Sequence, residues 1–159
     1  MPSLTPYAPL VLGAVFVVAL AVWLAGRRTG KATVAALLVL AWGLVIATTL
    51  TPSPYELFDR HITCSFSLSL GEVPEERLAN VALFVPLGFI SWFATPRLVW
   101  LGMAFLAPFV IEATQGLILA LNRECDVTDV LANVMGVGVG VAAAVLLAGV
   151  WSRANTGHA

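Results

Sequence analysis

Glu112 lies inside an apolar segment that is long enough to cross a lipid bilayer. Residues 98–121 carry no other acidic or basic side chain. A carboxylate inside a membrane helix costs at least ~2.5–3.5 kcal/mol on insertion scales, so something must compensate for it. The group could pair with an arginine, or it could be a hydrogen-bonded carboxyl that exchanges a proton as a general acid or base. Glu112 is therefore the first candidate functional residue.

Two further polar residues follow Glu112 on one side of the predicted helix. At 100° per residue, Gln115 lies about 60° from Glu112 around the helix axis. Arg123 lies about 20° from Glu112 if the helix continues that far. At 1.5 Å per residue, Glu112 would lie on the order of 12 Å below the outer end of this helix.

The neighbouring segments carry polar residues at helical spacing as well. Asp126, Asp129 and Asn133 are three and four residues apart, so they share a face of the last predicted helix. Arg77 and Asn80 begin another helix on one face. Because polar groups exposed to lipid are costly, we expect three helices to direct these side chains toward one another or into a wet cavity. The sequence therefore predicts one polar pocket in the outer half of the bilayer.

Most of these residues also have a purely structural interpretation. Asn80, Gln115 and Asn133 could each form a hydrogen bond between helices, which contributes about 0.6 kcal/mol on average. Asp126 could cap the last helix, and Asp129 would then lie in its first turn.

The charged residues leave further alternatives open. Arg123 could balance Asp126, and Glu112 could be a structural partner of Arg123 or Arg77. Glu112, Asp126 and Asp129 could also bind a divalent cation through oxygen. Carboxylates that pair with arginine look the same in a sequence, so we predict no metal site and no cofactor.

The composition places the chain among membrane proteins. Of its 159 residues, 60% are hydrophobic and 11% are charged, and the mean hydropathy is +0.95. Five apolar stretches approach the ~20 residues of a spanning helix, over residues 7–26, 32–50, 78–94, 98–121 and 127–151. The net charge of −1 gives no electrostatic case for nucleic-acid binding. We predict an all-α, integral membrane bundle of about five transmembrane helices with an outward-facing polar pocket.

The distribution of charges predicts an orientation. The basic cluster Arg27, Arg28 and Lys31 between the first two spans favours a cytoplasmic loop. The N-terminus would then lie outside and the C-terminus in the cytoplasm. All acidic residues except Glu112 would fall in or beside the two outer loops.

The two cysteines and a glycine pair give predictions about packing. Cys64 and Cys125 both fall in predicted outer loops, where an oxidising exterior permits a disulfide. We hypothesise a bridge that pins the long loop over the polar face at residues 123–129. Gly136 and Gly140 form a GxxxG pair, which we interpret as ordinary close packing of helices.

Three motifs occur in a fixed order in the second half of the chain. They are Asn80-Val-Ala-Leu-Phe-Val-Pro-Leu-Gly88, Ile111-Glu112-x-x-Gln115, and Arg123-x-x-Asp126-x-x-Asp129-Val-Leu-x-Asn133-x-x-Gly136. This combination, over residues 78–140, resembles the VanZ-like family of small bacterial membrane proteins. The resemblance implies a single site made by Asn80, Glu112, Gln115, Arg123, Asp126, Asp129 and Asn133.

The apolar stretches and the resemblance together divide the chain. Residues 1–77 would form two N-terminal transmembrane helices and an extracytoplasmic loop. Residues 78–151 would form a three-helix VanZ-like core, and residues 152–159 a short cytoplasmic tail. The expected location is the bacterial cytoplasmic (inner) membrane, with several spans.

The family is named for a teicoplanin-resistance determinant, so the resemblance implies a role at the cell envelope. The function we expect is binding or movement of an envelope lipid or a lipid-linked head group, with a link to glycopeptide resistance. Arg77 and Arg123 would attract phosphate or carboxylate, and the amide side chains would hydrogen-bond to the head group. The expected partners are membrane lipids or a lipid-linked envelope precursor, with no nucleic acid and with the oligomeric state open.

Two alternative functions fit the same residues. The first is an intramembrane enzyme in which Glu112 or Asp129 is the general acid–base on a lipid-linked substrate, with Asp126 in the same catalytic group. The second is a non-catalytic membrane scaffold, in which the polar face serves helix packing alone.

Overall fold

A computed structural model of the chain describes residues 30–52, 64–65 and 75–156, together with positions 16, 17, 19, 20 and 24. The predicted span 7–26 lies largely outside the described residues, although those five positions are helical. Most of the long loop predicted between the second and third spans lies outside them as well.

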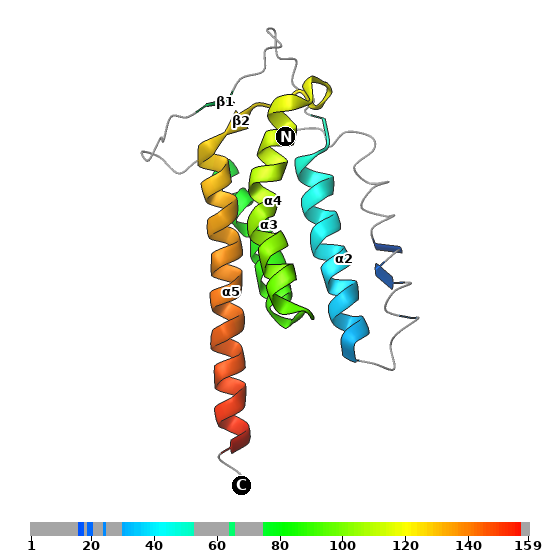
Figure 1. Ribbon diagram of the computed structural model, residues 1–159, viewed down its shortest axis with the longest axis vertical. Coiled ribbons are helices and arrows are strands. Elements are labelled where there is room, and N and C mark those ends of the chain that lie inside the picture. Colours follow the sequence, from blue (N-terminus) through cyan, green and yellow to red (C-terminus); the bar gives the residue numbers. More distant parts are fainter. Residues whose placement is uncertain are drawn as a thin grey trace.

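Four helices make up most of the described chain, and Figure 1 shows them as one bundle. They are α2 (Gly30–Thr49), α3 (Glu75–Phe93), α4 (Arg97–Leu117) and α5 (Val127–Thr156). Three segments are long and apolar enough to cross a membrane, Gly30–Thr49, Arg97–Leu117 and Val127–Ala154, and Arg77–Phe93 is a shorter apolar helix. These helices are those of a multi-pass membrane protein, whereas the predicted total of five spans stays a prediction.

Large apolar side chains lie on both the inside and the outside of the bundle. The core consists of Ala41, Val45, Phe84, Leu87, Ala104, Ala107, Ile111 and Val137. Outward-facing side chains are equally apolar, with Leu98 83% exposed and Leu146 70% exposed. Helices that are hydrophobic all round are typical of membrane spans, because the outer face contacts lipid instead of water.

Glycines allow α3 and α5 to pack with their backbones close together. A Cβ atom at Gly136 would lie 2.9 Å from Phe84 Cβ, and one at Gly140 would lie 2.7 Å from the Phe89 backbone nitrogen. Real side chains essentially never approach so closely. The packing interpretation of the GxxxG pair is therefore confirmed.

A methyl group at Gly140 is expected to force α3 and α5 apart. We expect Gly140→Ala to lower the free energy of unfolding by about 1–3 kcal/mol, as overpacking of tight contacts does. Gly138→Ala is the matched control, because a Cβ there would meet no atom within 4 Å and alanine is the better helix former. Denaturant titrations of both variants in detergent would measure the difference, and equal midpoints would contradict this account of the packing.

Helix α4 is shorter than the predicted span 98–121. It ends at Leu117, because Ile118 is extended (φ −97, ψ 90) and a 3₁₀ turn, η1 (Leu119–Leu121), follows. Asn122 is left-handed (φ 51, ψ 46), which turns the chain back toward the bundle. The expectation that the helix could carry Arg123 onto the face of Glu112 is therefore wrong. Glu112 lies about 8 Å from the end of its helix, not 12 Å.

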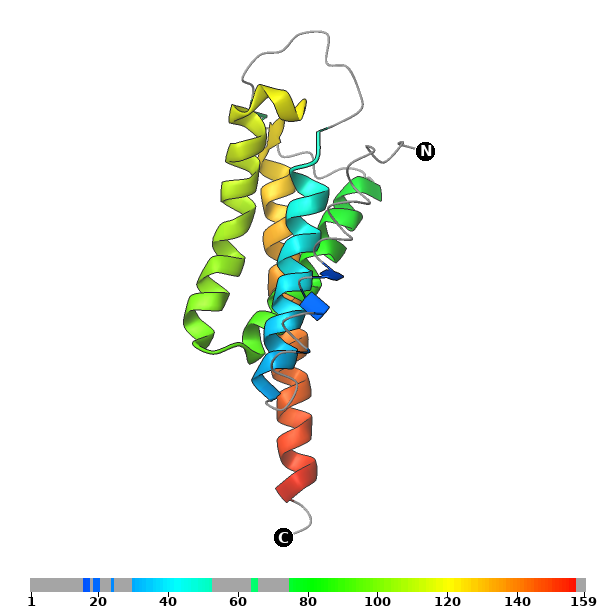
Figure 2. The same cartoon turned by 90° about the vertical axis from the view of Figure 1, so that its right-hand side faces the viewer.

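A short parallel strand pair closes one end of the bundle. Strand β1 (Cys64–Ser65) pairs with β2 (Cys125–Asp126), with Cys64 opposite Cys125. The two cysteines form a disulfide with a Cα–Cα distance of 4.5 Å, so the bridge considered from the sequence is present in the structure. We call the end of the bundle that carries β1, β2 and this bridge the disulfide end. Figure 2 shows α5 extending past the other helices at the opposite end, where the chain terminates.

Candidate polar site at the disulfide end

Glu112 is buried on α4 and accepts a hydrogen bond from the start of α5. Its side chain is 4% exposed, and its Oε2 accepts the backbone N–H of Asp126 at 3.1 Å. Among the described residues this is the one hydrogen bond to Glu112. The contact joins two helices and leaves Oε1 without a described partner.

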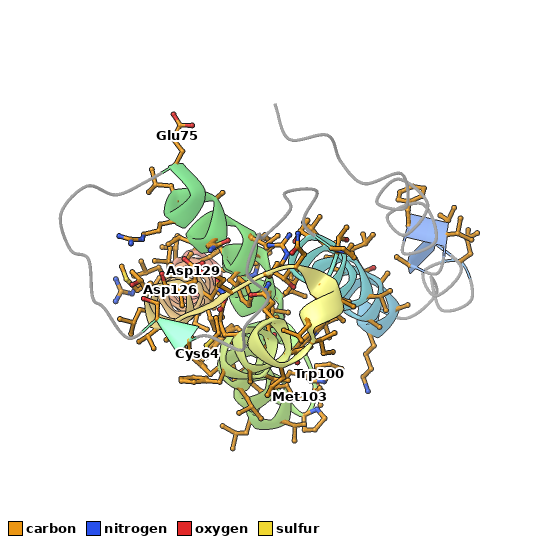
Figure 3. All side chains as sticks on the ribbon, turned by 90° about the horizontal axis from the view of Figure 1, so that it is seen from above. Cys64, Glu75, Trp100, Met103, Asp126 and Asp129 are labelled. Atoms are coloured by element: carbon orange, nitrogen blue, oxygen red, sulfur yellow. A yellow bond between two sulfur atoms is a disulfide. The ribbon has the colours of Figure 1, made fainter. Side chains whose placement is uncertain are left out.

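Asp126 links Glu112 to the N-terminus of α5. Its backbone N–H binds Glu112, and its Oδ1 accepts the backbone N–H of Thr128 at 2.8 Å. Asp126 is thus the N-cap of α5, which supports the capping interpretation of this residue. Asp129 lies in the first turn of α5 and, like Asp126 and Arg123, interacts electrostatically with Glu112. Figure 3 shows Asp126, at the end of β2, and Asp129, on α5, near each other and near Cys64.

Gln115 connects α4 to the end of α2. It is 5% exposed, and its Nε2 donates to the Thr49 carbonyl oxygen at 2.6 Å. The Thr49 hydroxyl is already satisfied, because it donates to the Val45 carbonyl oxygen one turn earlier. The Thr49 carbonyl is one of those that a helix C-terminus leaves without an intrahelical partner.

Arg123 binds the same end of α2. Its Nε donates to the Thr51 carbonyl oxygen and its Nη2 to the Thr48 carbonyl oxygen, each at 3.1 Å. Burial lowers the pKa of Arg123 from its ordinary value, while Glu112 and Asp129 raise it; a guanidinium stays charged at neutral pH. Positive charge at a helix C-terminus is favourable. Arg123 therefore holds α2 in place as well as contributing charge near Glu112.

Lysine is expected to replace Arg123 poorly. An ammonium group cannot present the two separated donors that reach Thr48 and Thr51. Because one charged hydrogen bond is lost at a partly exposed site, we expect Arg123→Lys to cost about 1.5 kcal/mol. Thermal unfolding in detergent would test this, and Arg153→Lys, on exposed α5, is the control. Equal stability of the Arg123→Lys variant and the wild type would show that the two carbonyl contacts contribute nothing.

The remaining predicted residues lie at the same end of the bundle. Asn133, on α5, is 1% exposed, and its Oδ1 has no hydrogen-bond partner among the described residues. Arg77 and Asn80 are half-buried in the first turns of α3. That Asn80 and Arg77 share a ligand with Glu112 stays a prediction. 

The disulfide packs directly on α4, one turn after Glu112. A Cβ atom at Gly116 would lie 2.8 Å from Cys125 Cβ and 3.4 Å from Cys64 Sγ. Only glycine leaves room for the bridge here. The bridge in turn fixes Cys125, which immediately precedes Asp126. The bridge therefore helps to hold the Asp126 N–H in place to donate to Glu112.

The site combines three acidic side chains with amides and an arginine. Within the described residues no group of three histidine, cysteine, aspartate or glutamate side chains could hold a metal ion. A cation bound jointly by Glu112, Asp126 and Asp129 is therefore not supported by the described geometry.

The order and spacing of these residues can be compared with known families. The family model described as VanZ/LLP1 matches residues 16–148. The chain belongs to this family. The match begins well before residue 78, so VanZ/LLP1 similarity extends into the N-terminal helices, which the three motifs alone did not cover. Comparisons with curated proteins and with solved structures gave no match.

Some residues at this end of the bundle could not be found from the sequence. The carbonyl groups of Thr48, Thr49 and Thr51 bind Gln115 and Arg123, but main-chain acceptors carry no signal in residue type. Gly116 follows Gln115 directly in the Glu-x-x-Gln motif, and its small size beside a polar pair was the available clue to close packing.

Proposed function

We propose that this VanZ/LLP1 protein binds an envelope lipid at its disulfide end and recognises a phosphate-bearing head group that also carries hydroxyl or amine donors. The observation that carries the proposal is the buried carboxylate of Glu112, which uses one oxygen on the Asp126 N–H. Intramembrane ionisable groups are rare and are usually functional. The second oxygen of Glu112, Oε1, would then accept a hydrogen bond from a ligand.

The neighbouring groups fit such a head group. Asn133 Oδ1 is a second buried acceptor, and hydroxyl or amine donors of a sugar or an aminophospholipid would satisfy both acceptors. Arg123 keeps its positive charge beside Glu112 and has guanidinium hydrogens beyond the two that bind α2, which would contact the phosphate. Arg77 would add a second cation from α3. We propose that these groups line an outward-facing pocket formed by five transmembrane helices.

The proposed setting is the cytoplasmic membrane of a bacterium, with the disulfide end outside. The disulfide supports this side, because such bonds persist in oxidising compartments. In this orientation the protein meets lipid-linked wall precursors, and a link to teicoplanin resistance would follow from handling them. Teicoplanin susceptibility of cells with and without the protein would test that link.

Co-purification of lipids would test the proposed function. Protein extracted from native membranes in mild detergent is expected to retain one lipid whose head group contains phosphate and hydroxyl or amine donors. Mass spectrometry of the extracted lipid would identify it. Retention of no lipid, or of bulk phospholipids in their membrane proportions, would contradict the proposal.

An intramembrane enzyme is the second candidate, favoured by one observation. The carboxylates of Glu112 and Asp129 repel each other across the α4–α5 contact, and two neighbouring carboxyl groups can serve as acid and base. Incubation of purified protein with the co-purified lipid would separate the two functions. A chemically altered lipid would establish catalysis, and an unchanged one would favour binding or movement. Native function after several polar residues are made apolar would favour a scaffold.

A further inference from the structure

A second feature of the bundle is an apolar groove between α2 and α4. One part of it, about 480 Å³ in volume, is lined by Ala35, Leu38, Val39, Trp42, Ile46, Trp100 and Met103. A second part, about 420 Å³, is lined by Gly30, Lys31, Val34, Ala35, Leu38, Phe93, Ala94, Thr95 and Trp100. The two parts share Ala35, Leu38 and Trp100, so they form one continuous channel, which we call the α2/α4 groove.

The arrangement of the helices explains the groove. At the disulfide end, the hydrogen bond from Gln115 to the Thr49 carbonyl ties α4 to α2. Farther from that end both helices pack on α3, and Phe93, its last residue, lines the second part of the groove together with Ala94, the residue that follows α3. Figure 3 shows Trp100 and Met103 side by side on α4, and both side chains line the groove.

The dimensions of the groove match a lipid chain. Between Lys31 and Ile46 it follows α2 for about 22 Å, at 1.5 Å per residue. This is longer than one leaflet, which is about half of the ~30 Å hydrocarbon thickness of a bilayer, so the groove is long enough for an acyl chain of one leaflet. The part between Trp42 and Met103 is almost wholly apolar in its lining. Because these helices are membrane spans, the groove would open toward lipid.

The charged and hydroxyl side chains are confined to one end of the groove. Lys31 is the one charged side chain among its described lining residues, and no carboxylate is present there. Lys31 is exposed, and the described residues provide no ion pair for it. The Thr95 hydroxyl and the first turn of α2 lie at the same end. This combination of an apolar channel with a cationic mouth is complementary to an anionic phospholipid.

We infer that the α2/α4 groove binds one anionic phospholipid, with an acyl chain along Trp42 and Trp100 and the phosphate at Lys31. In the proposed orientation this lipid belongs to the inner leaflet, on the other side of the bilayer from Glu112. The groove is therefore a site separate from the proposed head-group site, and either proposal can fail alone.

Native mass spectrometry of protein released from lipid nanodiscs would test this inference. The nanodiscs would contain phosphatidylcholine with a minor share of phosphatidylglycerol. The wild type is expected to retain one phosphatidylglycerol, enriched over its share in the bilayer. Lys31→Gln is expected to reduce that enrichment about fivefold while lipid still binds. Arg153→Gln, at the same end of the bundle, is the control for loss of a positive charge.

A second variant would test the position of the acyl chain. Ala35→Trp places a large ring in the shared part of the groove, and we expect it to abolish retention of the lipid. Leu106→Trp, on an exposed part of α4, is the matched control and should retain the lipid. Glu112→Gln should also leave it in place. If Ala35→Trp fails to fold, Lys31→Gln still decides the head-group preference.

Three results of the retention measurement would overturn the inference. They are retention of the two phospholipids by the wild type in their bilayer proportions, unchanged enrichment in Lys31→Gln, and full retention by a folded Ala35→Trp variant. Release of a dimer in place of a lipid-bound monomer, with dimerisation lost in Ala35→Trp, would also overturn it, because the groove would then be an interface between copies of the chain.

Discussion

Replacing Glu112 with glutamine is expected to lower retention of the proposed head group at least tenfold while the helices stay assembled. Glutamine keeps the shape of the side chain and an oxygen that can accept the Asp126 N–H. It removes the negative charge and replaces the second acceptor oxygen with a donor. Loss of one charged hydrogen bond in a buried site costs about 1.5–3 kcal/mol, which is a tenfold or larger change in affinity.

The measurement is binding of the co-purified lipid to protein in nanodiscs, followed by thermal unfolding of the same samples. Glu124→Gln is the matched control, because it makes the same chemical change at an exposed position at the disulfide end of the bundle. Glu112→Leu should unfold more easily, since it leaves the Asp126 N–H buried without a partner at a cost of about 1–3 kcal/mol. Undiminished head-group binding by the Glu112→Gln variant would argue against a ligand role for this carboxylate.

Removal of the disulfide is expected to have the largest effect on stability. The bridge closes a loop with a sequence separation of 61, for which the chain-entropy model gives about 4 kcal/mol. Because membrane helices persist in the unfolded chain, we expect a smaller loss of about 2–4 kcal/mol when both Cys64 and Cys125 become serine. Head-group binding should weaken as well, since Cys125 directly precedes the residue that donates to Glu112.

Unfolding of the wild type and of the double serine variant, with and without a reducing agent, would measure this effect. The reductant should lower the stability of the wild type to that of the double serine variant. It should leave the stability of the variant unchanged, so the variant controls for effects of the reductant other than cleavage of the bridge. Alkylation before any reduction gives an independent check. Two alkylated thiols in protein from native membranes would show that the bridge is absent and would remove this support for the proposed orientation.

The sequence predicted the features that follow from local periodicity. Helical spacing placed Gln115 near Glu112, and both side chains are buried on α4. The GxxxG pair on α5 predicted a close helix contact, and its glycines lie against the backbone of α3. Asp126 preceding an apolar run predicted the cap of α5. Each of these properties depends on residues within a few turns of one another.

The features that the sequence did not predict depend on contacts between distant residues. The end of α4 at Leu117 could not be placed, because the apolar run continues to Leu121 and the break is a backbone turn completed by Asn122. Once the helix ends early, Arg123 reaches the carbonyls of α2 and has no described hydrogen bond to Glu112. The α2/α4 groove arises from the angle between two helices, which no single segment encodes.

Cross-link mapping would show whether Glu112 and its neighbours bind a lipid head group. The co-purified lipid would carry a photoreactive diazirine on its head group and would be activated in nanodiscs, with an excess of unlabelled lipid as competitor. The label that excess unlabelled lipid suppresses is expected to map to residues 111–133, at the ends of α4 and α5 that surround Glu112. It is expected to be lost in Glu112→Gln. A competed label confined to the opposite end of the bundle, or one unchanged in Glu112→Gln, would contradict the proposed head-group binding.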